Sequence, residues 1–402
     1  MDKILQTRLL ALCTCVFLGY LTVGISLGTI PAYVHGTLGF NNLVVGLVIG
    51  LQSAATLASR HFSGTLCDRR GSRKAVLYGG ALSALAGVAY ILSVWLARAG
   101  VGTANGALSA LLAGRILLGL GESLLITGAL SWGIGLAGHQ RSGKVMAWVG
   151  IAMYGALACG APLGIALKAW YGLGASFAAV VAAPLIGLAC VRSLAGIKPG
   201  GHVRMPFYKV MGLVGRSGTG LALATVGLSC IASFISLYFS QREWAGAPLA
   251  LTVFGLAYIL VRLCFGHLPD TYGGARVAFV SLIVEIAGQL LLWLAPSPLV
   301  ALAGAALTGT GFSLVFPSFG VEAVKRLAPE NKGVALGAYV AFFDLSLGVT
   351  SPLAGWVAGH FGYAPIYGLG AAGAAFSAVL ALTLRRARPH ETKAASVKVA
   401  NA

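Results

Sequence analysis

Charged side chains are scarce in this 402-residue chain. Asp, Glu, Lys and Arg make up only 9% of it and hydrophobic residues 58%, whereas an ordinary soluble domain is roughly 25% charged. A water-soluble globule is therefore excluded. Twelve membrane helices of about 20 residues would use about 240 residues and leave about 160 for loops and tails. The 57 glycines suit such a bundle, because small residues let helix backbones approach closely in lipid.

Acidic residues are the scarcest charged type, with 10 Asp and Glu against 28 Lys and Arg. We interpret the net charge of +18 as orientation signals in membrane loops, because no basic stripe is interleaved with aromatic residues as in a nucleic-acid-binding surface. The seven cysteines lie singly in or beside apolar runs and predict no disulfide framework or metal site. The sequence has no phosphate-binding Gly-x-x-x-x-Gly-Lys-Ser/Thr segment and no context for a catalytic triad. We therefore predict no enzyme, no cofactor and no nucleic-acid partner.

Apolar runs separated by polar loops predict an all-α, polytopic membrane protein. The twelve predicted spans are 9–33, 43–66, 75–97, 109–131, 145–167, 176–194, 219–240, 250–268, 277–295, 299–321, 334–357 and 363–384. With the N-terminus placed inside, only Arg98, Lys168 and Arg242 among the Lys and Arg of the loops fall outside. Positive loops stay in the cytoplasm. Both termini are therefore predicted to be cytoplasmic.

An internal repeat divides the chain into two halves. Arg60, Gly64, Asp68, Gly71 and Lys74 recur at an offset of 202 as Arg262, Gly266, Asp270, Gly273 and Arg276, and Gly119, Gly121 and Pro162 recur at an offset of 190 as Gly309, Gly311 and Pro352. We predict two pseudo-symmetric six-helix halves, 1–194 and 219–385, with a cytoplasmic linker at 195–218 and a tail at 386–402. Many secondary transporters alternate access by rocking such halves about a central site.

Two loops carry the clearest motif. The first contains Gly64, Asp68, Arg69, Gly71, Arg73 and Lys74, and its weaker second copy contains Gly266, Asp270, Gly273 and Arg276. A tight turn between helices needs a glycine at the position of Gly71. An acid among basic residues can form a latch that breaks and re-forms. The segment resembles the G-x-x-x-D-R-x-G-R-K signature of the major facilitator superfamily, which implies a gating loop; the alternative is a set of orientation anchors.

The fourth span supplies a buried cation and an acid. Arg115-Ile-Leu-Leu-Gly119-Leu-Gly121-Glu122 resembles the R-x-x-x-G-x-G motif of the same superfamily. Arg115 and Glu122 share a helix face but are separated by about 10.5 Å of axial rise. An arginine within a membrane faces a cavity or a partner. Arg115 could thus hold an anionic substrate or tune a neighbouring acid, or it could cap carbonyl groups of a neighbouring helix.

Three further residues are candidates for coupling or substrate binding. Asp344 lies in the eleventh span, its counterpart in the repeat is Tyr154, and Glu285 lies in the ninth span. A buried carboxyl group can gain and lose a proton as its access alternates. We predict proton coupling through Asp344 or Glu122; alternatively, each pairs permanently with a helix dipole or with Arg115. Ninth spans form the scaffold in the family that this chain resembles, so Glu285 is expected to be structural.

Small residues predict close helix packing near these groups. In the fifth span Gly155, Gly160, Pro162 and Gly164 resemble the antiporter motif G-P-x-x-G-G, with an alanine between Gly160 and Pro162, and Gly348 and Pro352 repeat the pattern. Such glycines permit contact with a helix of the other half. By analogy with the family, the cavity wall is expected to include Tyr20, Gln52, Ser233, Tyr258 and Phe316.

The resemblance to the major facilitator superfamily covers essentially the whole chain. Pro31-Ala-Tyr33-Val-His35 and Phe343-Asp344-Leu-Ser-Leu-Gly look like the YhhS-type bacterial branch, grouped with sugar-efflux and drug-efflux permeases. This implies a monomeric, multi-pass exporter of the bacterial inner membrane, driven by the proton gradient, whose partners are a small-molecule substrate and the lipid bilayer. Proton-coupled antiport is the main hypothesis. An importing symporter, a membrane-embedded enzyme and a channel are the alternatives.

Overall fold

The chain folds into a bundle of helices. The computed structural model describes residues 3–99, 103–138, 141–196, 207–325 and 332–386, and no strand occurs among them. Twelve of the described helices are long and apolar enough to cross a membrane. The predicted all-α architecture with twelve spans is confirmed, although several helices extend beyond the predicted apolar runs.

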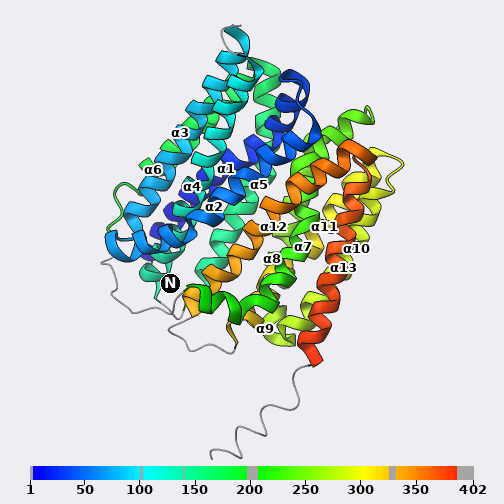
Figure 1. The fold of residues 1–402 in the computed structure, drawn as a ribbon. Helices are drawn as coiled ribbons and strands as arrows, with labels where there is room; N and C mark the ends of the chain where they lie inside the picture. Colours follow the sequence, from blue (N-terminus) through cyan, green and yellow to red (C-terminus); the bar gives the residue numbers. More distant parts are fainter. Residues whose placement is uncertain (1–2, 100–102, 139–140, 197–206, 326–331, 387–402) are drawn as a thin grey trace, which may run out of the picture.

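Six long helices form the first half of the bundle, coloured blue to green in Figure 1. They are α1 (Lys3–Ala32), α2 (Asn42–Arg70), α3 (Ser72–Ala99), α4 (Ala104–Ala137), α5 (Ser142–Tyr171) and α6 (Leu173–Val191). A π-helical turn, η1 (Tyr33–Thr37), continues α1.

The second half repeats this arrangement with one short additional helix. Its members are α7 (Phe207–Gln241), α8 (Ala247–Phe265), α9 (Leu268–Tyr272), α10 (Gly274–Trp293), α11 (Pro298–Val324), α12 (Lys332–Phe361) and α13 (Pro365–Arg386). Helix α7 already begins at Phe207, inside the segment predicted as a linker. Residues 197–206 of that linker and 387–402 of the predicted tail lie outside the described residues.

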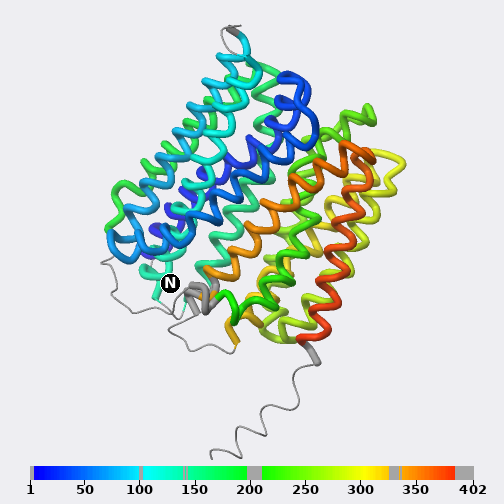
Figure 2. The backbone as a smooth tube through the Cα atoms, viewed as in Figure 1, coloured from blue at the N-terminus to red at the C-terminus, as the bar shows by residue number. Residues whose placement is uncertain are grey.

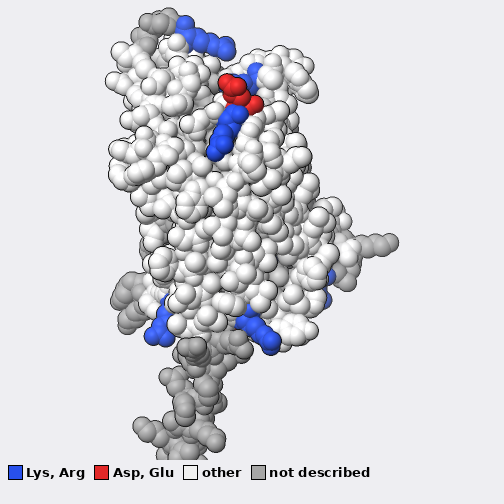
Figure 3. All heavy atoms as spheres, turned by 90° about the vertical axis from the view of Figure 1, so that its right-hand side faces the viewer, with Lys and Arg blue, Asp and Glu red and all other residues white. Residues whose placement is uncertain are grey.

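Both ends of the described chain lie at the same end of the bundle. The start of α1 and the end of α13 are at the bottom of Figures 1 and 2, which we call the lower end, and the opposite end the upper end. On the face shown in Figure 3, Lys, Arg, Asp and Glu lie toward the two ends, with an uncharged band between them. Large apolar side chains such as Val280 of α10 and Val379 of α13 are exposed. Such a surface matches the hydrocarbon layer of a bilayer.

The two copies of the loop motif form the same backbone turn. Gly71 separates α2 from α3 with a φ of +90°, and Gly273 separates α9 from α10 with a φ of +87°. Side chains with a Cβ rarely adopt this region. The glycine in each copy therefore allows two helices to follow each other directly at the lower end.

The halves meet along two seams, α2 against α12 and α5 against α8. In the upper part of the first seam the backbones touch, because a Cβ at Gly46 would clash with the carbonyl oxygen of Ser351. In the second seam the Thr252 hydroxyl donates a hydrogen bond to the Ala158 carbonyl oxygen at 2.9 Å. A Cβ at Gly255 would lie only 2.5 Å from the Cβ of Ala158. Both seams are thus tightly packed above the centre of the bundle.

Packing is looser in the lower parts of the same helices. A Cβ at Gly64 of α2, Gly150 of α5 or Gly337 of α12 would meet no heavy atom within 4 Å. The described halves therefore approach each other most closely in their upper parts.

The glycines of α5 do not all pack as expected. Gly348 and Pro352 of α12 do lie against Gly50 in the other half. By contrast, Gly160 lies against Gly24 and Gly164 against Ile25 of α1, so these two contact their own half rather than the other one. The reason is that α5 has two packed faces, and residues 154 and 158 occupy the one that faces α8.

Candidate translocation site

An ion pair joins the halves near the middle of the first seam. Arg60 Nε of α2 donates to Asp344 Oδ2 of α12, and their side chains are 11% and 4% exposed. The sequence left a helix dipole or Arg115 as candidate permanent partners of Asp344. The structure instead brings Arg60 to it. A buried charge without a partner is costly, so each residue accounts for the burial of the other.

Glu122 lies in a cage of donors within the first half. The Tyr20 hydroxyl donates to Glu122 Oε1 at 2.6 Å, Gln52 Nε2 to Oε2 at 2.7 Å, and the Thr56 hydroxyl to Oε2 at 3.3 Å. A Cβ at Gly119 would clash with the Gln52 carbonyl oxygen, so α4 and α2 lie in contact one turn away. Three donors from α1 and α2 thus stabilise this carboxylate. Tyr20 and Gln52, expected in a cavity wall, meet at Glu122.

Arg115 is enclosed between α4 and α2. It is 1% exposed, and its Nε and Nη2 donate to the carbonyl oxygens of Val48 and Ile49, each at 2.9 Å. No hydrogen bond to Glu122 or Asp344 is present among the described residues. This geometry matches the carbonyl-capping alternative and places the guanidinium away from the ion pair.

Aromatic rings from both halves stack beside the ion pair. Tyr154 of α5 and Tyr258 of α8 have ring centroids 3.8 Å apart, and Phe312 of α11 lies 6.5 and 6.3 Å from these rings. Phe343, next to Asp344 in α12, lies 6.4 Å from Phe312. The cluster therefore connects the second seam with the neighbourhood of Asp344.

Arg262 lies next to this cluster. Its Nη1 donates to the Ser313 carbonyl oxygen at 3.2 Å, and the Ser313 hydroxyl donates to the Tyr258 carbonyl oxygen at 2.8 Å. Among the described residues no carboxylate lies within 4.0 Å of its guanidinium. Arg262 is half-buried. It is the repeat counterpart of Arg60, which has a carboxylate partner.

Other candidates lie away from these groups. The Ser233 hydroxyl donates to Ser351 Oγ at 3.0 Å, and the Phe316 carbonyl oxygen accepts a hydrogen bond from the Tyr339 hydroxyl at 2.7 Å. Glu285 is fully buried in α10, and neither of its carboxyl oxygens has a hydrogen-bond partner. These three residues do not contact Asp344 or Glu122 through any of these bonds.

The loop motif contributes one contact across the lower end. Arg73 Nη2 donates to the Arg192 carbonyl oxygen at 2.8 Å and ties the start of α3 to the end of α6. Four other charged members of the motif are exposed: Arg69, Lys74, Asp270 and Arg276. Gly121 of the fourth span instead packs against α3, where its Cβ would lie 2.6 Å from Ser83 Oγ.

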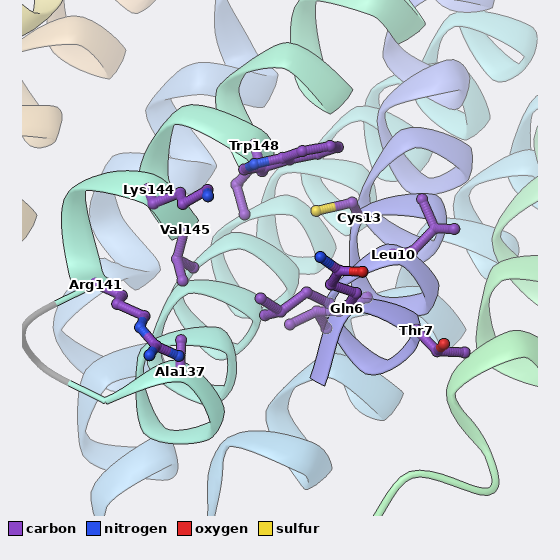
Figure 4. Close-up of a pocket in the computed structure, with 12 residues that line it drawn as sticks. Gln6, Thr7, Leu10, Cys13, Ala137, Arg141, Lys144, Val145 and Trp148 are labelled. Atoms are coloured by element: carbon purple, nitrogen blue, oxygen red, sulfur yellow. The ribbon is translucent and has the colours of Figure 1, made fainter. Parts of the chain in front are cut away.

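A cavity of about 640 Å³ opens at the lower end between α1, α4 and α5. Figure 4 shows Arg141, Lys144 and Trp148 on one side and Gln6 and Cys13 on the other. Its lining contains these two cations and no acid.

The sequence model of the Major Facilitator Superfamily matches residues 12–245 and 217–400. The chain belongs to this superfamily. An uncharacterized MFS-type transporter of Burkholderia mallei (strain SAVP1) is 43% identical over 95% of this chain and 93% of its own length. One of Salmonella typhimurium (strain LT2) is 42% identical over 94% and 97%. Among solved structures, a D-xylose-proton symporter covers 94% of this chain and 97% of its own with a TM-score of 0.76 and 16% identity.

These similarities establish a multi-pass membrane transporter of the superfamily, as the loop and fourth-span motifs implied. The likeness to the symporter establishes the fold alone. In this MFS transporter the residue that sequence reasoning missed is Arg60. A signal was present: the repeat relates Arg60 to Arg262 and Tyr154 to Asp344, which places all four on the α2–α12 and α5–α8 pairs of helices.

Proposed function

We propose that this MFS transporter exports a small organic solute across the bacterial inner membrane by alternating access, in exchange for protons. The observation that supports the proposal best is the ion pair between Arg60 and Asp344 across the two halves. Protonation of Asp344 would remove one of its two charges. The attraction between α2 and α12 would then weaken where the halves must separate.

Charge near the pair supports the same role. Glu122 is held by Tyr20, Gln52 and Thr56 within the first half. It is also close enough to Arg60 to interact with it electrostatically. When Asp344 is neutral, Arg60 can therefore remain balanced by Glu122 within its own half. The proton would shift the partner of Arg60 from the second half to the first.

The packing suggests which stage of the cycle the described conformation represents. The seams are tight in their upper parts and open around Gly64, Gly150 and Gly337 lower down. We take the lower end as cytoplasmic because of the distribution of Lys and Arg in the loops. The conformation is then closed to the outside with Asp344 ionised, as expected after a proton has been released to the cytoplasm.

The driving force is sufficient for this exchange. A membrane potential of 100 mV supplies about 2.3 kcal/mol per charge, and one pH unit supplies about 1.36 kcal/mol. One proton per cycle could thus sustain a solute gradient of more than tenfold.

Distance measurements test the coupling without knowledge of the solute. Spin labels at Gly36→Cys and Gly359→Cys report on the upper ends of the two halves, and labels at Gly64→Cys and Gly337→Cys report on the lower ends. The exposed Cys159, Cys190 and Cys264 are first replaced by Ser. We expect acidification to lengthen the upper distance and shorten the lower one, and Asp344→Asn to fix this change at all pH values. Distances that ignore both would reject the proposal.

The direction of transport needs a separate measurement. Small molecules are compared inside and outside cells that express the wild type or Asp344→Asn. Export predicts a solute enriched outside only with the wild type. Enrichment inside would favour the importing symporter, and single-channel currents in bilayers would favour a channel.

A further inference from the structure

The two seams of the bundle are related by the internal repeat but differ in charge. The offset of 202 relates Arg60 to Arg262, and the offset of 190 relates Tyr154 to Asp344. The ion pair of α2 and α12 therefore corresponds to Arg262 and Tyr154 on α8 and α5. Where the first seam has a carboxylate, the second has a phenol.

Arg262 is thus a cation whose symmetry-related carboxylate is missing. Its printed hydrogen bond goes to the Ser313 carbonyl oxygen, which does not neutralise its charge. The phenol groups of Tyr154, Tyr258 and Tyr339 lie within electrostatic range of it. None of its nitrogens is both buried and without a partner, and the residue is half-buried. A ligand can therefore reach the guanidinium.

The surroundings of Arg262 differ from those of Arg115. The Arg115 guanidinium has 1% of its residue exposed and is held by two carbonyl groups. Arg60 is already paired with Asp344. Among the arginines of the spans described here, Arg262 is the one with both access and no acid beside it.

An apolar surface lies beside this cation. The rings of Tyr154 and Tyr258 stack with centroids 3.8 Å apart, and Phe312 lies next to them. Tyr154 belongs to one half and the other two rings to the second half. A ligand on this surface would contact both halves, as a transported solute must.

We propose that Arg262 binds the carboxylate of the transported solute and that the rings of Tyr154, Tyr258 and Phe312 pack against its apolar body. The substrate class is then a small aromatic carboxylate, which takes beside Arg262 the place that Asp344 takes beside Arg60. Arg141 and Lys144 in the cavity at the lower end would attract such an anion. This inference rests on the proposed transport function and specifies its substrate.

Thermal unfolding of the purified, full-length protein tests the charge of the ligand. Benzoate, benzamide and benzamidine have nearly the same shape and carry negative, zero and positive charge. Indole-3-acetate and its amide extend the series. We expect a carboxylate to raise the melting temperature in a saturable way and the amides and benzamidine to leave it unchanged. Stabilisation by benzamidine, by amides and acids equally, or by no compound would overturn the assignment.

Variants locate the effect at the second seam. Arg262→Gln should abolish the stabilisation by the carboxylate, Arg262→Lys should retain part of it, and the exposed Arg276→Gln should leave it unchanged. Tyr154→Asp would place a carboxylate beside Arg262 and should abolish it, whereas the equally small, neutral Tyr154→Asn should retain it in part. An unchanged shift in Arg262→Gln, or equal shifts in the two Tyr154 variants, would overturn the proposal.

The two proposals can fail separately. The spin-label distances described above require no added ligand and depend on Asp344. If they respond to pH and Arg262→Gln leaves the carboxylate effect intact, only the substrate assignment is wrong. If the carboxylate binds at Arg262 while the distances ignore pH, proton coupling is wrong.

Discussion

Arg60 and Asp344 are 284 positions apart in the chain and form an ion pair that joins α2 of one half to α12 of the other. Both side chains are largely withdrawn from solvent. The pair lies where the tight upper part of the seam gives way to the looser lower part. Its rupture is therefore the step at which chemistry and movement of the halves can be linked.

Removal of one partner should destabilise the described conformation. In Asp344→Asn the guanidinium of Arg60 loses its charged partner, and breaking a buried pair in this way costs about 3–5 kcal/mol. We expect the spin-labelled upper ends to separate. The double variant Arg60→Gln with Asp344→Asn leaves no unpaired charge and should lose less than the sum of the single changes. An additive double variant would mean that the two residues are not coupled.

The close approach at Gly46 should hold the upper part of the seam together. A Cβ there would clash with the Ser351 carbonyl oxygen, whereas one at Gly64 has open space. Gly46→Ala should cost about 1–3 kcal/mol through overpacking and lengthen the upper spin-label distance. Gly64→Ala on the same helix serves as the control and should leave this distance unchanged. The same effect of both variants would point to helix propensity rather than to contact between the halves.

Arg115 should act mainly on stability. The sequence alone predicted that Arg115→Ala abolishes transport and leaves the protein folded. The two hydrogen bonds to Val48 and Ile49 change this expectation, since buried carbonyl groups without donors cost about 1–3 kcal/mol each. We expect Arg115→Ala to lower the melting temperature and the yield of folded protein. A normal melting temperature with abolished flux would restore the earlier hypothesis.

Glu285 should tolerate loss of its acidity. It is fully buried and neither carboxyl oxygen has a partner, and an isolated ionised carboxylate would be far too costly there. A neutral side chain of the same shape should therefore serve equally well. Glu285→Gln should keep the melting temperature and the response of the spin-label distances to pH, whereas Glu285→Ala should lower stability by creating a cavity. Loss of the pH response in Glu285→Gln would assign the coupling to this residue.

Composition and periodicity were sufficient to predict much of this protein. Few charges and long apolar runs require spans that satisfy their own backbone hydrogen bonds, and the offsets of 202 and 190 predict two related halves. The glycines at 71 and 273 predict turns, because their φ angles exclude most side chains. These features depend on local chemistry or on repetition, and both can be read along one chain.

Which residues pair across the halves was decided only by the tertiary structure. Asp344 could have met Arg60, Arg115 or a helix end, and Gly160 could have faced either half. The outcome depends on the rotation of each helix about its axis and on which seam it occupies, and both are set by packing between segments hundreds of residues apart. Sequence thus determined the twelve spans and their repetition, whereas packing determined that Asp344 is paired and that Arg262 is not.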